Sequence, residues 1–169
     1  MLETPQELDC LQSLLDASMA SAGPHLRGII SDERRLDARQ LTGRLQGLCL
    51  LVLATATADG RPLAGPVDGY FLHGTFWFSS GTESVRRRHL ATRPAVSATH
   101  LPGEEFAVTV HGRAQCYPMD DPACAELRQA VLDVYLPKQG PAFEEWLDNA
   151  DALAARIEPE KIFTFQLVT

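Results

Sequence analysis

A run of hydroxyl and guanidinium side chains stands near the middle of the sequence, in the stretch FSSGTESVRRRHLATRPAVS. Ser79 and Ser80 precede a Gly-Thr pair, and three consecutive arginines follow at positions 86–88. Hydroxyl groups donate hydrogen bonds, and guanidinium groups bind phosphate or carboxylate oxygens as a two-pronged fork. The pattern therefore predicts an anion site, with phosphate as the favoured ligand. The alternative is a solvated helix face that only softens the net charge.

A short helix over residues 82–91 is expected to carry these arginines, because a Thr or Ser can cap its start and Arg-Pro ends it. Its first backbone N–H groups have no partner inside the helix, which favours an anion there. Successive helical side chains fan out by about 100° each, so three in a row cannot face one ligand. We expect Arg86 to bind, Arg87 to assist, and Arg88 to face solvent or a partner.

A second candidate stretch, RPLAGPVDG, follows an Asp-Gly turn. Arg61 begins it, and Gly65 and Pro66 interrupt what otherwise looks like a strand. Proline removes a hydrogen bond from a strand ladder and glycine permits close approach, so a flat ring can lie against such a backbone. The alternative is an edge strand whose proline blocks aggregation.

Composition narrows the class of protein. The chain has 169 residues, 45% of them apolar, and a net charge of -7, which favours a single globular domain over residues 1–169. The acidic balance argues against nucleic-acid binding. The longest apolar run, LCLLVLA, is far shorter than the roughly 20 residues that span a bilayer. The N-terminus lacks the pattern of a signal peptide, so we expect no membrane association and a cytoplasmic location.

The metal-ligating residue types form no recognisable metal motif. Neither the four cysteines nor the five histidines show the spacing of a zinc site, and no metal is expected. The same residues identify no catalytic acid or base, so the catalytic residues stay unknown.

The elements that must position these residues follow from periodicity. Helices are expected within residues 1–47, the first capped by Thr4 and the second covering Ser31–Leu45. Residues 48–118 show alternating strands near 48–57, 62–72 and 75–79, then two more after the arginine helix. Helices are expected over 119–157 and a closing strand over 160–168. Six antiparallel strands with flanking helices indicate an α+β fold in which the sheet closes into a barrel.

These motifs together resemble the flavin-binding split-barrel family related to pyridoxamine 5'-phosphate oxidase. The similar region runs from about Leu48 to Tyr117, with IFTFQL as a weaker echo. The family's order is an Asp-Gly-Arg-Pro hairpin, a Pro-Val strand, a strand ending in Ser or Thr, then Ser-x-Lys-x-x-Asn-Leu and Asn-Pro-x-Val. Here these stand as DGRPLAGPV, TFWFSS, SVRRRHL and RPAVS.

The resemblance implies a homodimer with flavin mononucleotide (FMN) between the subunits, and an oxidoreductase of unknown substrate. Four groups of positions match the family's flavin site. They are the phosphate-binding position Arg86 with Arg87 as an extra contact, the strand-end residues Ser79 and Ser80, the phosphate-side Arg61, and the ring-facing strand Gly65, Pro66 and Val67.

The departures from the family pattern keep other functions open. Arg86 replaces lysine, His89 replaces asparagine, and Ala107 stands where the vitamin oxidase has a flavin-contacting glutamine. The oxidase's C-terminal arginine motif is missing, so pyridoxamine 5'-phosphate oxidase activity is not expected. The alternatives are a reductase using a deazaflavin coenzyme, a non-catalytic flavin or haem binder, and an empty pocket whose arginine helix contacts a protein partner.

Overall fold

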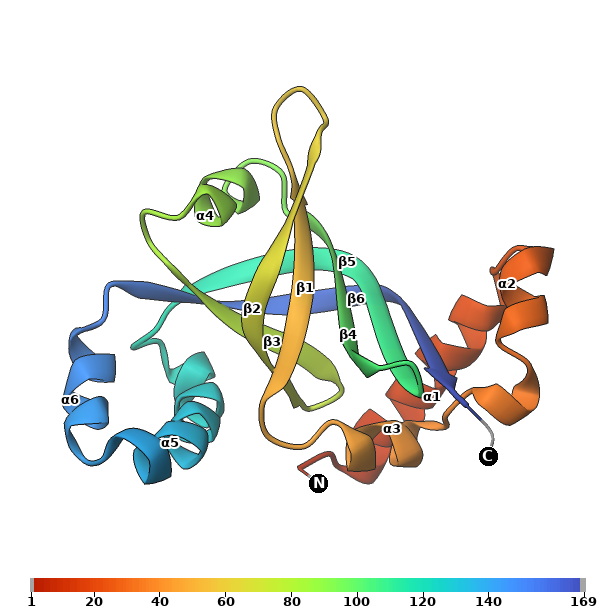
Figure 1. Ribbon diagram of the computed structural model, residues 1–169, viewed down its shortest axis with the longest axis horizontal. Coiled ribbons are helices and arrows are strands. Elements are labelled where there is room, and N and C mark those ends of the chain that lie inside the picture. The colour runs from red at the N-terminus through yellow and green to blue at the C-terminus, as the bar shows by residue number, and fades with distance from the viewer. Residues whose placement is uncertain (1, 168–169) are drawn as a thin grey trace.

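The strands alternate between buried and exposed residues because their inner faces enclose one core. The computed structural model describes residues 2–167 and arranges six antiparallel strands as a closed barrel in the order β1-β2-β3-β6-β5-β4 (Figure 1). The strands are β1 Cys49–Ala56, β2 Pro62–Leu72, β3 Thr75–Gly81, β4 Ala95–Gly103, β5 Phe106–Pro118 and β6 Ala152–Gln166. The α+β class and the six-stranded antiparallel barrel predicted from the sequence are confirmed.

Six α-helices flank the barrel within the described residues, with two short 3-10 turns between them. The helices are α1 Pro5–Ala20, α2 Pro24–Ile29, α3 Ala38–Arg44, α4 Val85–Leu90, α5 Ala125–Gln139 and α6 Ala142–Asn149, and the turns are η1 Asp32–Arg34 and η2 Pro122–Cys124. Figure 1 shows α1–α3 on one side of the barrel and α5–α6 on the other, with α4 beside the β1–β2 hairpin. None of the helices within residues 2–167 is long and apolar enough to cross a bilayer.

Two apolar clusters hold these layers together. The larger one fills the barrel with side chains such as Leu51, Phe78 and Val108 and continues under α1 and α3. The smaller one lies between the outer face of the barrel and α5–α6, where Tyr70 and Trp77 from the sheet meet residues of both helices. The helices after β5 are therefore packed on the sheet by their own core.

The first N-terminal helix forms as expected, but the second does not. Thr4 caps α1 through a reciprocal capping box with Glu7, as predicted. The single helix expected over Ser31–Leu45 is wrong: the chain forms η1 and then α3, with extended backbone at Arg35 between them. A second capping box, built on Asp37, starts a new helix there and sets its boundary.

The last strand begins much earlier than expected. The prediction of helices over 119–157 fails after Asn149, because Ala152–Ile157 belong to β6 rather than to a helix. This segment pairs with β3 on one edge and with β5 on the other, and those ladders outweigh the helix propensity of its alanines. The expected closing strand 160–168 is thus only the second half of β6, and its residue 168 lies outside the described residues.

Candidate functional site

Strands β2 and β3 separate halfway along β2. They pair from Gly69 to Leu72, and β3 then turns to β6, where Ser79 and Ser80 pair with Ala154 and Leu153. The first half of β2 stays paired only with β1. An opening between two strands of the barrel results, and it is flanked by residues predicted from the sequence.

Helix α4 places Arg86 across this opening. The Arg86 Nη1 donates to the Ser80 hydroxyl at 3.4 Å, and its Nη2 donates to the Pro66 carbonyl at 3.5 Å. A Cβ at Gly65 would lie 3.5 Å from the same Nη2, so glycine leaves room for the guanidinium. The structure therefore brings Arg86, Ser80, Gly65 and Pro66 together.

The proline in β2 is explained by the same geometry. A residue of an antiparallel strand points its N–H and C=O to the same side, and the Pro66 carbonyl points to Arg86. An N–H at that position would also face the opening, so proline removes no bond to β1. Successive residues of a strand point their backbone N–H and C=O groups to opposite sides, so those of Gly65 and Val67 point towards β1. The Val67 side chain is buried in the core. Pro66 is thus the residue of this predicted trio whose backbone faces the opening.

Arg86 is half-buried and has no counter-ion in the part of the chain that the structure describes. Among residues 2–167, no carboxylate lies within ion-pair distance of its guanidinium, and burial lowers the pKa of Arg86 from its usual value. Both of its hydrogen bonds are long, and five N–H groups are available on the side chain. A half-buried cation with spare donors is suited to an incoming anion.

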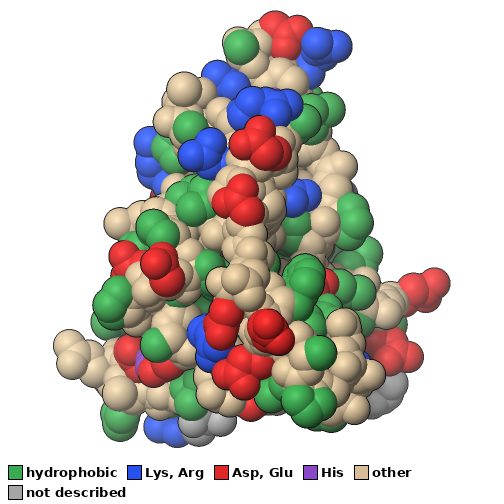
Figure 2. All heavy atoms as spheres, turned by 90° about the vertical axis from the view of Figure 1, so that its left-hand side faces the viewer, with side chains coloured by type: hydrophobic (Ala, Val, Ile, Leu, Met, Phe, Trp, Pro, Cys, Tyr) green, Lys and Arg blue, Asp and Glu red, His purple; other side chains and the backbone are tan. Residues whose placement is uncertain are grey.

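The rest of α4 carries the two other arginines, whose expected roles stay predictions. Ser84 caps the helix by accepting the Arg87 N–H at 3.1 Å, and its hydroxyl also lies 2.8 Å from that of Ser80. Arg87 and Arg88 are exposed, and Arg88 donates to the Glu83 carbonyl. Figure 2 views the molecule from the left-hand side of Figure 1, and it shows Lys and Arg side chains gathered in the upper part of that face, with Asp and Glu more frequent below them.

Arg61 stands apart from the group. It is exposed at the end of the β1–β2 hairpin, where its Nε contacts Asp59 at 2.9 Å. About 16 Å of extended strand separates it from Pro66. The structure does not bring Arg61 to Arg86 within this chain, and its role in the site stays a prediction.

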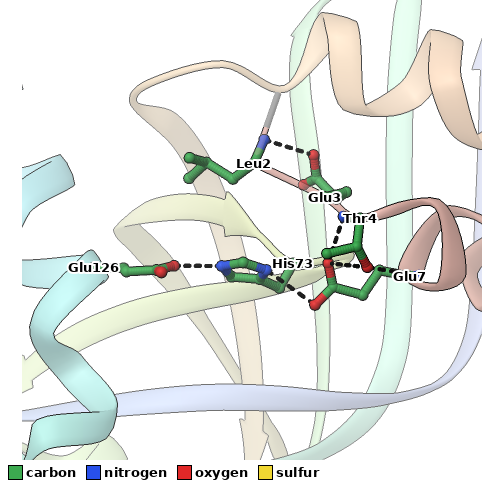
Figure 3. A network of polar contacts seen from close by, with 6 residues as sticks. All are labelled: Leu2, Glu3, Thr4, Glu7, His73 and Glu126. Carbon is green, nitrogen blue, oxygen red and sulfur yellow. Dashed lines mark hydrogen bonds and ion pairs between the residues drawn. The ribbon is translucent and has the colours of Figure 1, made fainter.

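Four of the five histidines have hydrogen-bond partners within the chain. His89 is buried, and its Nδ1 lies 2.9 Å from the Thr55 hydroxyl. His73 lies between Glu7 and Glu126 and joins the β2–β3 turn to α1 and α5 (Figure 3). Burial lowers the pKa of His73, but the hydrogen bonds and charges of the two glutamates outweigh it and raise that pKa overall. In the part of the chain that the structure describes, no three His, Cys, Asp or Glu side chains are grouped to hold a metal ion.

A cavity that was not predicted from the sequence lies next to the opening. Asp68 of β2 and Ser79 of β3 line a cavity of about 370 Å³, which α5 and α6 close from the other side. The sequence predicted helices over this segment but no cavity beside them. The signal in the sequence that could have indicated the cavity is the aromatic content of α5 and α6, since Tyr135, Phe143 and Trp146 all line it.

Comparisons with known proteins place the chain among relatives of one fold. The profile of the family described as Pyridoxamine 5'-phosphate oxidase matches residues 39–165. No curated protein matches the chain. A conserved hypothetical protein from Mycobacterium tuberculosis has a TM-score of 0.66 and 18% identity, over 80% of this chain and 88% of that one.

Two further solved structures differ in what their names say they bind. HutZ, the haem storage protein from Vibrio cholerae, has a TM-score of 0.62 and 19% identity, over 78% of this chain and 95% of its own. A protein named F-420 reductase has a TM-score of 0.55 and 23% identity, over 70% of this chain and 91% of its own. At these identities the likeness establishes the fold alone.

Proposed function

This chain belongs to the pyridoxamine 5'-phosphate oxidase family, and from that premise we propose that it binds FMN and acts as an oxidoreductase. The observation that carries the proposal is Arg86, a half-buried guanidinium that bridges two parted strands with no carboxylate near it in residues 2–167. A phosphate group supplies the negative charge that this position lacks.

The residues of the opening fit the parts of FMN. Arg86 would hold the phosphate with the Ser80 hydroxyl, and Ser79 and the exposed Arg87 would be the further contacts that the family pattern implies. Pro66 would line the ring through backbone that β3 leaves uncovered, and the neighbouring Gly65 would leave room beside the Arg86 guanidinium. Bound flavin supplies hydride transfer to or from a substrate or a nicotinamide nucleotide, and the protein supplies binding and orientation.

A second copy of the chain completes the proposed site. Leu50 and Val52 are 58% and 54% exposed on the outer face of β1, and Leu101 on β4 is 61% exposed. Large apolar side chains on adjacent strands of one face mark an association surface, and a symmetric dimer is the commonest way to cover one. In such a dimer the projecting β1–β2 hairpin can carry Arg61 to the cofactor of the other subunit.

A reductase that uses a deazaflavin coenzyme is the second candidate. Its specific support is that Arg87 and Arg88 are exposed next to Arg86 and have no carboxylate partner among the described residues. These two cations suit the longer acidic tail of that coenzyme.

The visible absorption spectrum of the purified protein separates these functions. A flavin band, present at once or gained on titration with FMN, is the expected result. A blue-shifted deazaflavin band that forms in preference to it supports the second candidate, and a Soret band formed with haem contradicts both. A protein that stays colourless with all three ligands rules out FMN, the deazaflavin and haem alike as its cofactor.

A further inference from the structure

The cavity between the barrel and α5–α6 begins where the proposed flavin cleft ends. Ser79, which lines it, is next to the Ser80 that Arg86 contacts, and Asp68 shares strand β2 with Pro66. Its volume of about 370 Å³ lies within the range of small-molecule sites, and its walls are mostly apolar with a few polar groups. The cavity is therefore distinct from the Arg86 site and adjacent to it.

Tyr70 lines the cavity and carries an unsatisfied hydroxyl. The residue is 2% exposed, and its hydroxyl has no hydrogen-bond partner within residues 2–167. Burial first, and then the charges of Tyr135 and Asp68, raise the pKa of Tyr70, so its phenol stays protonated and is a donor. A buried donor without an acceptor costs about 1–3 kcal/mol, which a ligand acceptor recovers.

Asp68 adds an acceptor that is already oriented. Tyr135 donates to one carboxylate oxygen of Asp68, and that bond raises the pKa of Tyr135 to about 12. A carboxylate accepts several hydrogen bonds, so Asp68 can take another from a ligand. No Lys or Arg lines the cavity in the part of the chain that the structure describes, which disfavours an anionic occupant.

Three aromatic rings form the opposite wall. Tyr135 and Phe143 stack with centroids 5.1 Å apart, and Phe143 and Trp146 stack at 5.3 Å. Trp146 is 62% exposed, which leaves one face of the stack free. Such a wall favours a flat aromatic or conjugated molecule over an aliphatic one.

We propose that this cavity is the substrate site and that it takes a planar, uncharged aromatic or conjugated carbonyl compound bearing an O–H or N–H group. The carbonyl accepts from Tyr70, the O–H or N–H donates to Asp68, and the rings stack on the wall that ends at Trp146. The role of the cavity as a substrate site rests on the proposed function, because it assumes a flavin at Arg86. Binding itself does not depend on the flavin.

Calorimetric titration of the full-length protein with 7-hydroxycoumarin at pH 6 tests this site. Tyr70→Phe should weaken binding about 3- to 10-fold by removing one hydrogen bond, and Trp146→Ala should weaken it by a similar factor. Tyr117→Phe is the matched control, since that tyrosine packs on Trp77 outside the cavity. Melting temperatures report folding, and Tyr70→Phe should melt no lower than wild type.

The outcomes separate this proposal from the flavin proposal. Binding that falls in Tyr70→Phe and Trp146→Ala, but holds in Tyr117→Phe and Arg86→Ala, supports the cavity. No binding, equal binding by all variants, or a loss confined to Arg86→Ala overturns it. A protein that binds the coumarin and not FMN keeps the cavity and loses the proposed function; one that binds FMN alone does the reverse.

Discussion

The guanidinium of Arg86 lies 3.4 Å from the hydroxyl of Ser80, across the opening where two barrel strands separate. This contact joins the helix that carries the arginines to the strand that carries the serines. Both groups are half-buried, and the hydrogen bond between them is long, so neither is saturated. The pair is arranged to receive an anion rather than to neutralise one within the chain.

Replacing Arg86 with alanine is expected to weaken FMN binding by about 1.5–3 kcal/mol, or roughly 10- to 150-fold in Kd. The reason is the loss of charge-assisted hydrogen bonds at a position without a competing carboxylate. Fluorescence titration of FMN measures the change. Arg88→Ala is the control, because Arg88 is exposed and contacts the Glu83 carbonyl. Equal losses in the two variants would contradict the division of the triplet.

Local signals in the sequence predicted much of the fold. The capping box at Thr4 and the serine cap of the arginine helix depend on side chains within a few residues of one another, and both are present. The strand pattern and the family resemblance both predicted the barrel, and the resemblance placed Arg86 and Ser80 in one phosphate site. The structure brings these two residues into contact, while what they bind stays a prediction.

The missed features depend on contacts between distant segments. Ala152–Ala155 look helical in isolation and become a strand because β3 and β5 offer open edges on both sides. The cavity needs Asp68 and Tyr135, which are 67 positions apart in the chain. Periodicity carries no information on such a pairing, so the cavity could not be predicted from the sequence.

Gly112→Ala is expected to destabilise the fold by about 2–3 kcal/mol and to lower the melting temperature by roughly 5–10 °C. The reason is that a Cβ at Gly112 would overlap the backbone carbonyl of Glu158, where β5 and β6 shift register. The three nearest atoms are all backbone atoms of Glu158 and Pro159, which leaves little room for adjustment. Gly103→Ala is the control, since a Cβ there meets nothing within 4 Å. Thermal or urea unfolding measures both, and similar stabilities would contradict the strand register.

The ion pairs of His73 should make stability depend on pH. Its pKa is raised in the folded protein, so the stabilisation is complete below the unfolded pKa of about 6.5 and is lost as pH rises through the folded pKa. His73→Gln should therefore destabilise the protein at pH 5.5 and have no effect at pH 9. The difference should stay below about 1 kcal/mol, because the site is partly exposed.

Urea unfolding of wild type and His73→Gln across this pH range measures the effect. His25→Gln is the control, because His25 is an exposed histidine in α2. A difference between wild type and His73→Gln that grows towards pH 9 has the wrong sign and would exclude the raised pKa.

The cysteines provide a test of Arg87. Cys116 on β5 is an exposed residue. Partial desolvation of its thiol raises the pKa of Cys116, and the charge of Arg87 lowers that pKa in part. Arg87→Ala should therefore raise that pKa further and slow alkylation of Cys116 at pH 7.5, because the thiolate is the reactive form. Mass spectrometry of iodoacetamide-treated protein gives the rate at each cysteine.

Two internal comparisons make this measurement specific to Arg87. Cys10 is also exposed and should alkylate at the same rate in both proteins, whereas Cys49 is buried, with a pKa raised to about 11, and should react only after unfolding. Arg88→Ala should leave Cys116 unchanged, because the partial lowering of its pKa comes from Arg87. A slower Cys116 in Arg88→Ala, or an unchanged rate in Arg87→Ala, would show that Arg87 does not direct its charge towards β5.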